Sequence, residues 1–489
     1  MNIQELLSKL DFGNQVAEFD KDTEHHFVVT EAFRELIENK ADIVAGDKGS
    51  GKTTIFNYIK EQYTQVPELS KIEIISGFNP SGSPVFQRLL QLEPLSEGQY
   101  LSLWKVYILS LVGNWLLQLY EGSYSESMNK LNSLFIRSDL RSTDNSAETV
   151  FSRLTQLTQR FLNPKNIGVE ISRDTLGNPT ITPKLEFGDL NREVKLDIIA
   201  YDDALTLLNS ALFESDITVW VLIDKLDEAF VGFPQFEVPA LRALLRAYLD
   251  LLAFDHISLK LFIRKDLMKK MVRGGFVNLT HLNARKTEII WEKEDLFALV
   301  CKRIKSNNDF LRLTGLHGAT DQKIFETIFS ERLEAGERKP ITWNWILSQI
   351  RDGNDVVAPR NLVQLMGFAR DEQRRREQRK ERGFSSEEPI IESESLKRAV
   401  TRLSEQRVDD TLLAEASRDV AVLIEGFRGG KQEHNDESIS RLFGVKPTQA
   451  HEYAETLIGI GLLERNGTNE SYKIAPLYRD GLDIHRGKA

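Results

Sequence analysis

Four short apolar segments of the chain have the composition of buried parallel strands. They are rich in aliphatic and β-branched residues, and they occupy residues 43–45, 72–75, 217–223 and 259–264. Helical spacing of apolar positions follows the first segment, and it recurs between the last two at residues 239–252. Strands that alternate with helices are typical of proteins in which helices cover both faces of a parallel sheet. The pattern therefore predicts an α/β fold, a three-layer sandwich with a parallel sheet.

The chain between the second and third predicted strands is longer than this fold needs, so we expect an insertion over about residues 80–200. Helical patterns run through residue 140 and over residues 147–161. Residues 167–171 and 180–187 then alternate with period two around a Gly-Asn-Pro turn, which predicts a β-hairpin. The hairpin is either a partner site or a simple decoration of the fold.

Residues 100–120 form an apolar stretch that approaches the length of a membrane span and carries aromatic residues at its ends. Lys105, Asn114 and Gln118 interrupt it, and their burial in lipid is costly. We expect a helix buried in the protein rather than a membrane segment.

Three regions are predicted along the chain. Residues 1–290 form the core with its insertion, residues 291–384 a helical lid, and residues 385–489 a winged-helix domain. A Gly-Phe-Ser-Ser-Glu-Glu-Pro segment at residues 383–389 is the expected linker, after a mixed-charge helical stretch that we interpret as a solvated face. The winged helix is predicted from three helices and a hairpin, at residues 411–427, 436–443, 447–460, 462–465 and 472–474.

Composition changes this picture little. The chain has 489 residues, 41% hydrophobic and 28% charged, as expected of a soluble globular protein. Its one cysteine, Cys301, excludes an internal disulfide and lies in a helical pattern, so we expect a buried thiol. The N-terminus has no basic segment followed by an apolar one, which favours a cytoplasmic location. The net charge of −10 argues against an extended basic surface for binding nucleic acid.

Residues 46–53 have the pattern G-x-x-x-x-G-K-[ST] between the first predicted strand and the helix that follows it. Glycine is needed there because backbone N–H groups must curve around a phosphate without obstruction from Cβ atoms. Lys52 is placed to reach the β- and γ-phosphates, and the Thr53 hydroxyl to bind Mg²⁺. The predicted nucleotide-binding residues of this loop are Gly46, Asp47, Lys48, Gly49, Ser50, Gly51, Lys52, Thr53 and Thr54.

The third predicted strand ends in Asp224, and Asp227 and Glu228 follow it. A carboxylate at the end of a strand beside a phosphate loop can hold Mg²⁺, so Asp224 and Thr53 are the predicted metal ligands. Glu228 or Asp227 is placed to activate the attacking water, and these acids with Lys52 are the predicted catalytic residues. The alternative is that the two acids only cap the next helix.

Two arginines are further candidates for nucleotide contact. Arg264 ends the fourth predicted strand, where it either faces the nucleotide or forms an ion pair with Asp266 or Asp224. Arg360 follows Pro359 in the first turn of a predicted helix, where a cation opposes the helix dipole and suggests an anionic partner. The alternative for Arg360 is a surface ion pair with Asp355.

These motifs together resemble P-loop ATPases of the STAND, NACHT and KAP type and their AAA+ relatives, including origin-recognition ATPases. The resemblance covers parts of residues 15–370 and rests on the phosphate loop (Walker A), the Ile-Asp-x-Leu-Asp-Glu strand end (Walker B), the Phe-Ile-Arg-x-Asp strand end and the Pro-Arg helix start. It implies Asp224 on Mg²⁺, Glu228 as the catalytic acid and Arg360 as a sensor-like arginine. Residues 17–28 are similar to the segment that precedes the phosphate loop in bacterial members and that lies near the base of the bound nucleotide.

The resemblance implies an ATP-driven switch that forms nucleotide-dependent oligomers. ATP is expected over GTP because no Asn-Lys-x-Asp tetrad follows the acidic strand. With no repeat period in the chain, we expect a separate effector or sensor protein as partner, as in bacterial conflict systems such as phage defence. The alternatives are a DNA-loading ATPase and a nucleotide-gated scaffold that scarcely hydrolyses ATP. DNA is not favoured, because the third winged-helix segment carries only His451 as a cation beside Glu452 and Glu455.

Overall fold

The computed structural model describes residues 2–20, 22–77, 96–138, 140–141, 169–173, 179–185, 199–226, 234–273, 275–467 and 471–489. The chain divides into two compact units. We call one the sheet unit, which contains Val29–Gly46 and Lys52–Ile290. The other is the helical unit, which contains Met1–Val28, Asp47–Gly51 and Trp291–Ala489.

The sheet unit is built on a five-stranded sheet in the order β2-β6-β7-β1-β8, and every neighbouring pair is parallel. The predicted four strands are confirmed, and their bounds are β1 (Ile43–Gly46), β2 (Ile72–Ser76), β6 (Thr218–Ile223) and β7 (Ile257–Arg264). The sequence did not predict β8 (Lys286–Glu288), because this short edge strand is polar and lacks an apolar run.

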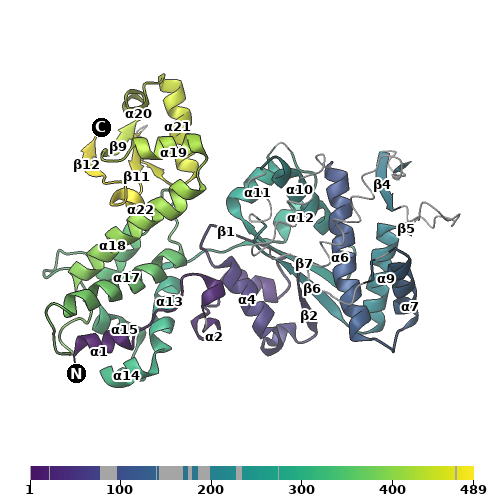
Figure 1. The fold of residues 1–489 in the computed structure, drawn as a ribbon, viewed down its shortest axis with the longest axis horizontal. Helices are drawn as coiled ribbons and strands as arrows, with labels where there is room; N and C mark the ends of the chain where they lie inside the picture. The colour runs from purple at the N-terminus through teal and green to yellow at the C-terminus, as the bar shows by residue number, and fades with distance from the viewer. Residues whose placement is uncertain are drawn as a thin grey trace. The chain divides into compact units, whose positions relative to one another are not determined.

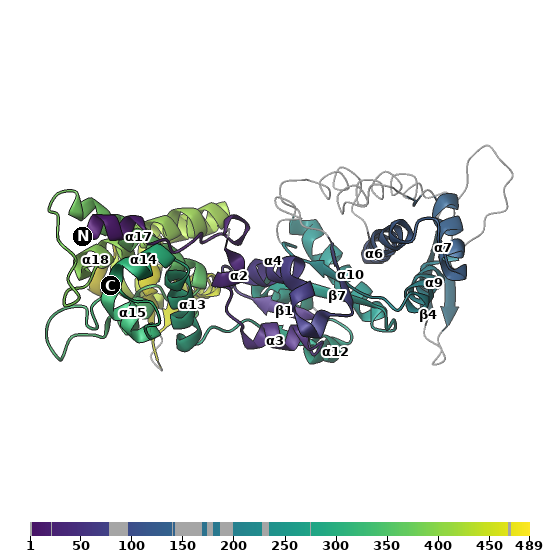
Figure 2. The same cartoon turned by 90° about the horizontal axis from the view of Figure 1, so that it is seen from below.

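Helices cover both faces of this sheet, as the alternation along β7 shows. Leu261 and Ile263 belong to a core cluster that includes helices α6 (Glu97–Leu119) and α10 (Pro234–Leu251). Phe262 points the other way and packs edge-on against Phe56 of α4 (Lys52–Gln62), with ring centroids 5.8 Å apart. Figures 1 and 2 show α4 and α10 on opposite sides of the sheet. The predicted three-layer α/β fold is therefore confirmed. The remaining helices of the unit are α3 (Glu31–Ile37), η2 (Tyr63–Gln65), η3 (Pro67–Leu69), α7 (Glu126–Arg137), α9 (Tyr201–Glu214), α11 (Lys265–Val272) and α12 (Leu279–Ala284).

Helix α6 is the predicted buried helix of the insertion. Its Trp104 donates to the carbonyl of Ala240 in α10 at 2.9 Å, and its Lys105 pairs with Asp202 and Asp250. In the described part of the chain α6 alone is long and apolar enough to cross a membrane, but 78% of that window is buried inside the protein. The prediction of a core helix is confirmed.

The predicted hairpin of the insertion is also present. Strand β3 (Val169–Arg173) pairs antiparallel with β4 (Pro179–Leu185), which pairs with β5 (Ile199–Ala200). The helix expected at residues 147–161 lies outside the described residues.

The first segment of the chain packs in the helical unit, although we expected residues 1–290 to form one core. Ile3, Leu6 and Phe12 are buried in a second hydrophobic cluster with Leu362 and Leu365, because α1 (Ile3–Ser8) lies against α17 (Pro359–Glu377). The unit's helices up to this point are α1 (Ile3–Ser8), η1 (Ala17–Phe19), α2 (Thr23–His26), α13 (Lys293–Lys305), α14 (Asn308–Thr314), α15 (Asp321–Ile328), α16 (Thr342–Gln349) and α17 (Pro359–Glu377).

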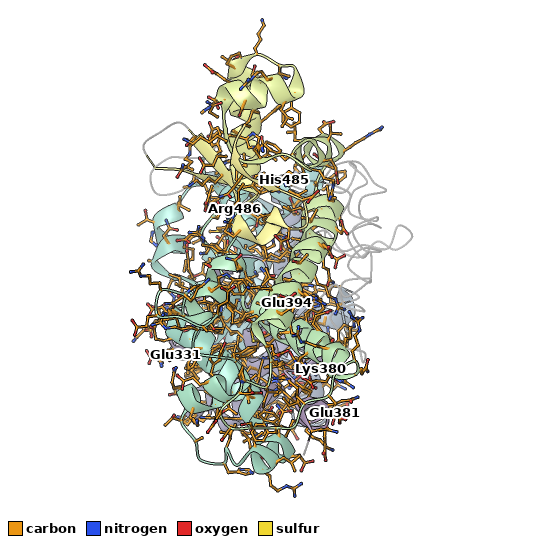
Figure 3. All side chains as sticks on the ribbon, turned by 90° about the vertical axis from the view of Figure 1, so that its left-hand side faces the viewer. Glu331, Lys380, Glu381, Glu394, His485 and Arg486 are labelled. Carbon is orange, nitrogen blue, oxygen red and sulfur yellow. The ribbon has the colours of Figure 1, made fainter. Side chains whose placement is uncertain are left out.

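The expected linker at residues 383–389 is a short packed connection and not a boundary between compact units. It joins α17 to α18 (Ser393–Arg407), and these two helices pack together in the same hydrophobic cluster. Ile390 and Ile391, which follow it, are buried. Lys380 and Glu381, labelled in Figure 3, lie exposed in the segment just after α17, and Glu394 is exposed in the first turn of α18.

The C-terminal part of the helical unit has the predicted winged-helix topology. Helices α20 (Asp436–Phe443) and α21 (Pro447–Gly459) are joined through Gly444 at φ +66°, and the wing is the hairpin of β10 (Leu463–Arg465) and β11 (Ser471–Ile474). The helix expected at residues 411–427 is instead a π-helical turn, Val408–Leu413, followed by α19 (Arg418–Gly426). The chain continues through α22 (Pro476–Arg479), and the sheet order is β10-β11-β9-β12. Its strands β9 (Lys431–Asn435) and β12 (His485–Lys488) were not predicted because both are polar.

A buried charge network lies at the start of the central strands. The Lys260 ammonium is fully buried, 2.6 Å from Asp42 and 3.8 Å from the centre of a Trp220 ring. Burial lowers the pKa of Lys260 to about 8, against the attraction of Asp42. Burial alone raises the pKa of Asp42, but hydrogen bonds from Arg285 and the charge of Lys260 outweigh it and hold this pKa below its usual value. Asp42 also accepts from the Tyr248 hydroxyl at 2.8 Å, so it is the shared acceptor of the network.

We expect unequal losses of stability when Asp42 and Lys260 are replaced separately. Asp42→Ala leaves Lys260 as a buried cation without its counter-charge, and should lower the free energy of unfolding by about 3–5 kcal/mol. Lys260→Met should cost about 1 kcal/mol or less, because Arg285 and Tyr248 still satisfy Asp42. Urea titration followed by tryptophan fluorescence measures both, and equal losses would contradict the assignment of Asp42 as the shared acceptor.

Candidate nucleotide site

The phosphate loop has the backbone that its glycines were predicted to supply. Strand β1 ends at Gly46 and α4 begins at Lys52, with Thr53 and Thr54 in its first turn. Gly49 has φ +75° and Gly51 has φ +98°, a region that residues with a Cβ rarely adopt. The Lys52 ammonium donates to the Gly46 carbonyl at 2.9 Å, so the lysine side chain folds over the loop. This is the curved backbone followed by a helix N-terminus that binds phosphate groups.

The two predicted nucleotide motifs meet in the sheet unit. The Thr53 hydroxyl donates to Oδ2 of Asp224 at 2.7 Å, although the two residues are 171 positions apart in sequence. Asp224 directly follows β6 and is 2% exposed. A buried carboxylate needs a partner, and here that partner is the hydroxyl that was predicted to bind the same metal.

The chain turns sharply after this carboxylate. Lys225 has φ +57°, a left-handed conformation that is uncommon for a side-chain-bearing residue and concentrates at functional sites. The predicted catalytic acids Asp227 and Glu228 follow, and both lie outside the described residues. Their roles therefore stay predictions.

Asp224 and Thr53 fit a Mg²⁺ ion that completes its shell with phosphate and water. No group of three or more His, Cys, Asp or Glu residues able to hold a metal occurs in the described ranges. Mg²⁺ binds octahedrally and retains several waters, so one carboxylate and one hydroxyl suffice when phosphate oxygens supply further ligands. The donor set is compatible with a metal that would bind together with a nucleotide.

Arg264 lies at the same edge of the sheet as the phosphate loop. Its position in β7 is paired in register with Gly46 of β1, and β7 separates β1 from β6. Its guanidinium forms two hydrogen bonds with Asp266, at 3.0 and 2.9 Å. The ion-pair alternative with Asp266 is thus observed, at a position that adjoins the loop.

In the helical unit, Arg360 contacts the glycine part of the loop. Its backbone N–H lies 3.5 Å from the Gly49 carbonyl, and a Cβ added to Gly49 would come within 3.0 Å of the Arg360 Cβ. Asp355, the alternative partner of Arg360, instead pairs with Arg351 at 2.9 Å. The first turn of α17 therefore lies directly against Gly49, which is a second reason for glycine at this position.

Two further contacts of the loop were not foreseen from the sequence. The Trp291 indole donates to the Ser50 carbonyl at 2.7 Å, and Lys48 forms an ion pair with Glu415. Each partner is distant in the chain and belongs to no motif, so only the folded structure identifies it. Both contacts hold loop residues to other parts of the helical unit.

Asp352 is a carboxyl group with an altered proton affinity near the loop. Burial raises the pKa of Asp352 to about 6, and the charge of Asp47 in the loop acts in the same direction. Hydrogen bonds from the amides of Val356 and Asn354, both at 2.9 Å, oppose this shift. Cys301 shows the same effect of burial, which raises the pKa of its thiol to about 12 and confirms the expected buried cysteine.

Comparisons with known proteins give only low similarity. No family model matches the chain, and no curated protein matches it. Among solved structures, the chain is similar to the Aeropyrum pernix ORC2 protein in its ADPNP–ADP complexes, with a TM-score of 0.41 and 12% identity over 93% of this chain and 90% of that one. It is also similar to the Aeropyrum pernix ORC1 protein in complex with DNA, with a TM-score of 0.36 and 10% identity over 96% of each chain.

We expect Asp352→Asn to stabilise the protein increasingly as the pH rises. Because the folded pKa of Asp352 lies above its ordinary value of 3.8, the stability linked to its proton is present at low pH and is lost as the pH rises through 6. Asparagine keeps the acceptor for both amides without the charge, so at pH 8 the variant should gain about 1–2 kcal/mol over the wild type. Unfolding titrations from pH 5 to pH 8 measure the difference, and a gain that does not grow with pH would contradict the assignment.

Proposed function

We propose that this chain is an ATP-binding and ATP-hydrolysing molecular switch of the P-loop class. The hydrogen bond between Thr53 and Asp224 is the observation that supports this most directly, because it joins the two motifs that share Mg²⁺ in such enzymes. The positive-φ glycines and the lysine folded over the loop agree with it.

In this proposal each residue of the site has a defined task. The loop amides and Lys52 bind the β- and γ-phosphates, and Thr53 and Asp224 hold Mg²⁺, which neutralises charge on the phosphates. Glu228, assisted by Asp227, orients and deprotonates the attacking water. Arg360, and Arg264 when released from Asp266, stabilise charge on the γ-phosphate.

We further propose that ATP controls an oligomer of the chain and, through it, a separate effector or sensor protein, as in the AAA+ and STAND group that the motifs resemble. Phage defence is one such setting. Arg360 and Glu415 contact loop residues from distant parts of the helical unit, so a nucleotide on the loop has a direct route to the elements that carry them.

A DNA-dependent ATPase is the second candidate, and the winged-helix topology favours it. Most cations on its helix and wing are engaged: His451 lies 3.2 Å from Asp436, and Arg465 pairs with Glu455. His485 and Arg486 are exposed on the edge strand β12, as Figure 3 shows, and an exposed arginine there is available to a phosphate backbone. Stimulation by duplex DNA distinguishes this candidate from the first.

Nucleotide binding and hydrolysis test the proposal together. Lys52→Ala should weaken Mg·ATP binding at least about tenfold, because the main cation on the β- and γ-phosphates is lost. The matched control is Lys60→Ala, an exposed lysine later in the same helix, which should bind as the wild type does. Fluorescent ATP titrations measure both, and equal affinity of the two variants would exclude the loop as the binding site.

Hydrolysis should separate the roles of the acids and the hydroxyl. Glu228→Gln should retain binding while kcat falls about a hundredfold or more, as expected for a lost general base. Thr53→Ala should lose Mg²⁺-dependent turnover, whereas Thr53→Ser keeps the hydroxyl and should retain most of it. A wild type that binds ATP and turns over no faster than Glu228→Gln supports the nucleotide-gated scaffold instead.

A further inference from the structure

Arg407 is a buried cation without a carboxylate partner. It is the last residue of α18, it is 4% exposed, and its Nη2 donates to Oε1 of Gln15 at 3.0 Å and to Oε1 of Gln364. Its Nε has no hydrogen-bond partner, and no ion pair joins it to any acid that the structure describes. Amide oxygens satisfy part of its hydrogen-bonding capacity but leave its charge uncompensated.

An uncompensated buried charge is unfavourable unless something else requires it. Burial and, to a smaller extent, the charge of the nearby Arg360 lower the pKa of Arg407 to about 10, while Asp410 and Tyr478 act in the opposite direction. Asp410 is already the acceptor of a hydrogen bond from Gln406 at 2.7 Å. The only other buried cation of this unit with comparable burial, among those described, is Arg303, which pairs with Asp20 at 2.7 Å.

The position of Arg407 connects it to the phosphate loop. Its acceptor Gln364 lies four positions after Arg360 on α17, so the two side chains share one face of that helix. The stem of Arg360 lies against Gly49, and its Nε is also buried without a hydrogen-bond partner. Arg407 is thus linked through Gln364 of α17 to the arginine that covers Gly49.

We propose that Arg407 is a positioning residue that makes the loop prefer a nucleoside triphosphate over a diphosphate. Arg407 repels Arg360 and holds it toward Gly49, and the additional negative charge of the γ-phosphate relieves the repulsion between the two cations. A nucleoside diphosphate lacks that charge, so its binding gains little from relief of this repulsion. This inference rests on the proposed function, since it assigns the nucleotide selectivity of the same site.

The ratio of two dissociation constants tests it. For Mg·ADPNP and Mg·ADP, Arg407→Gln should reduce the preference for the triphosphate about tenfold, mainly by weakening ADPNP binding. Arg407→Lys keeps the charge and should retain most of the preference. The control Arg402→Gln removes a cation from the same helix, one that stacks 4.0 Å above Phe368, and should leave the ratio unchanged.

A second variant tests the charge without removing the arginine. Gln15→Glu places a carboxylate beside Arg407 Nη2. This carboxylate offsets the charge that the γ-phosphate would otherwise offset, so the preference for the triphosphate over the diphosphate should again fall. This change adds an ion pair, which keeps the test valid if Arg407→Gln does not fold. Unchanged ratios in the folded variants would overturn the inference while leaving the proposed function intact. A wild type that binds neither nucleotide would overturn both.

Discussion

The hydrogen bond from Thr53 to Asp224 is the constraint on which the site depends. It requires the turn after β1 and the end of β6 to face each other at one edge of a parallel sheet, with β7 between the two strands. The carboxyl ends of parallel strands open onto the same crevice, so the order of the strands decides which side chains can meet there. Because Asp224 is buried, the sheet must hold this carboxylate where its hydroxyl partner, or a metal in its place, can satisfy it.

Two buried cations, Lys260 and Arg407, differ in whether a carboxylate neutralises their charge. Lys260 has a full counter-charge in Asp42, which in turn is satisfied by Arg285 and Tyr248, so this network stabilises the base of the sheet. Arg407 has only amide oxygens, and its cation neighbour Arg360 lies against Gly49. A site that keeps an unneutralised cation near a phosphate loop gives up some stability of the fold and becomes more attractive to an anion.

The sequence predicted what local patterns determine. Strands β1, β2, β6 and β7 are apolar runs, and the phosphate loop is a local motif, so both were found. Strands β8, β9 and β12 were missed because their residues are polar and their pairing comes from neighbours distant in the chain. For the same reason the contacts of Trp291 and Glu415 with the loop, and the burial of Arg407, had no sequence signal. The packing of residues 3–12 against α17 was missed because an apolar helix does not itself indicate its partner.

A crystal structure of the chain with ADPNP and Mn²⁺ tests the central claim most directly. Manganese gives an anomalous signal and takes the oxygen ligands that Mg²⁺ takes. We predict one manganese peak within coordination distance of both the Thr53 hydroxyl and Asp224, with the β- and γ-phosphates on the amides of the loop. Nucleotide density elsewhere on the chain, or a metal that contacts neither residue, would contradict the account.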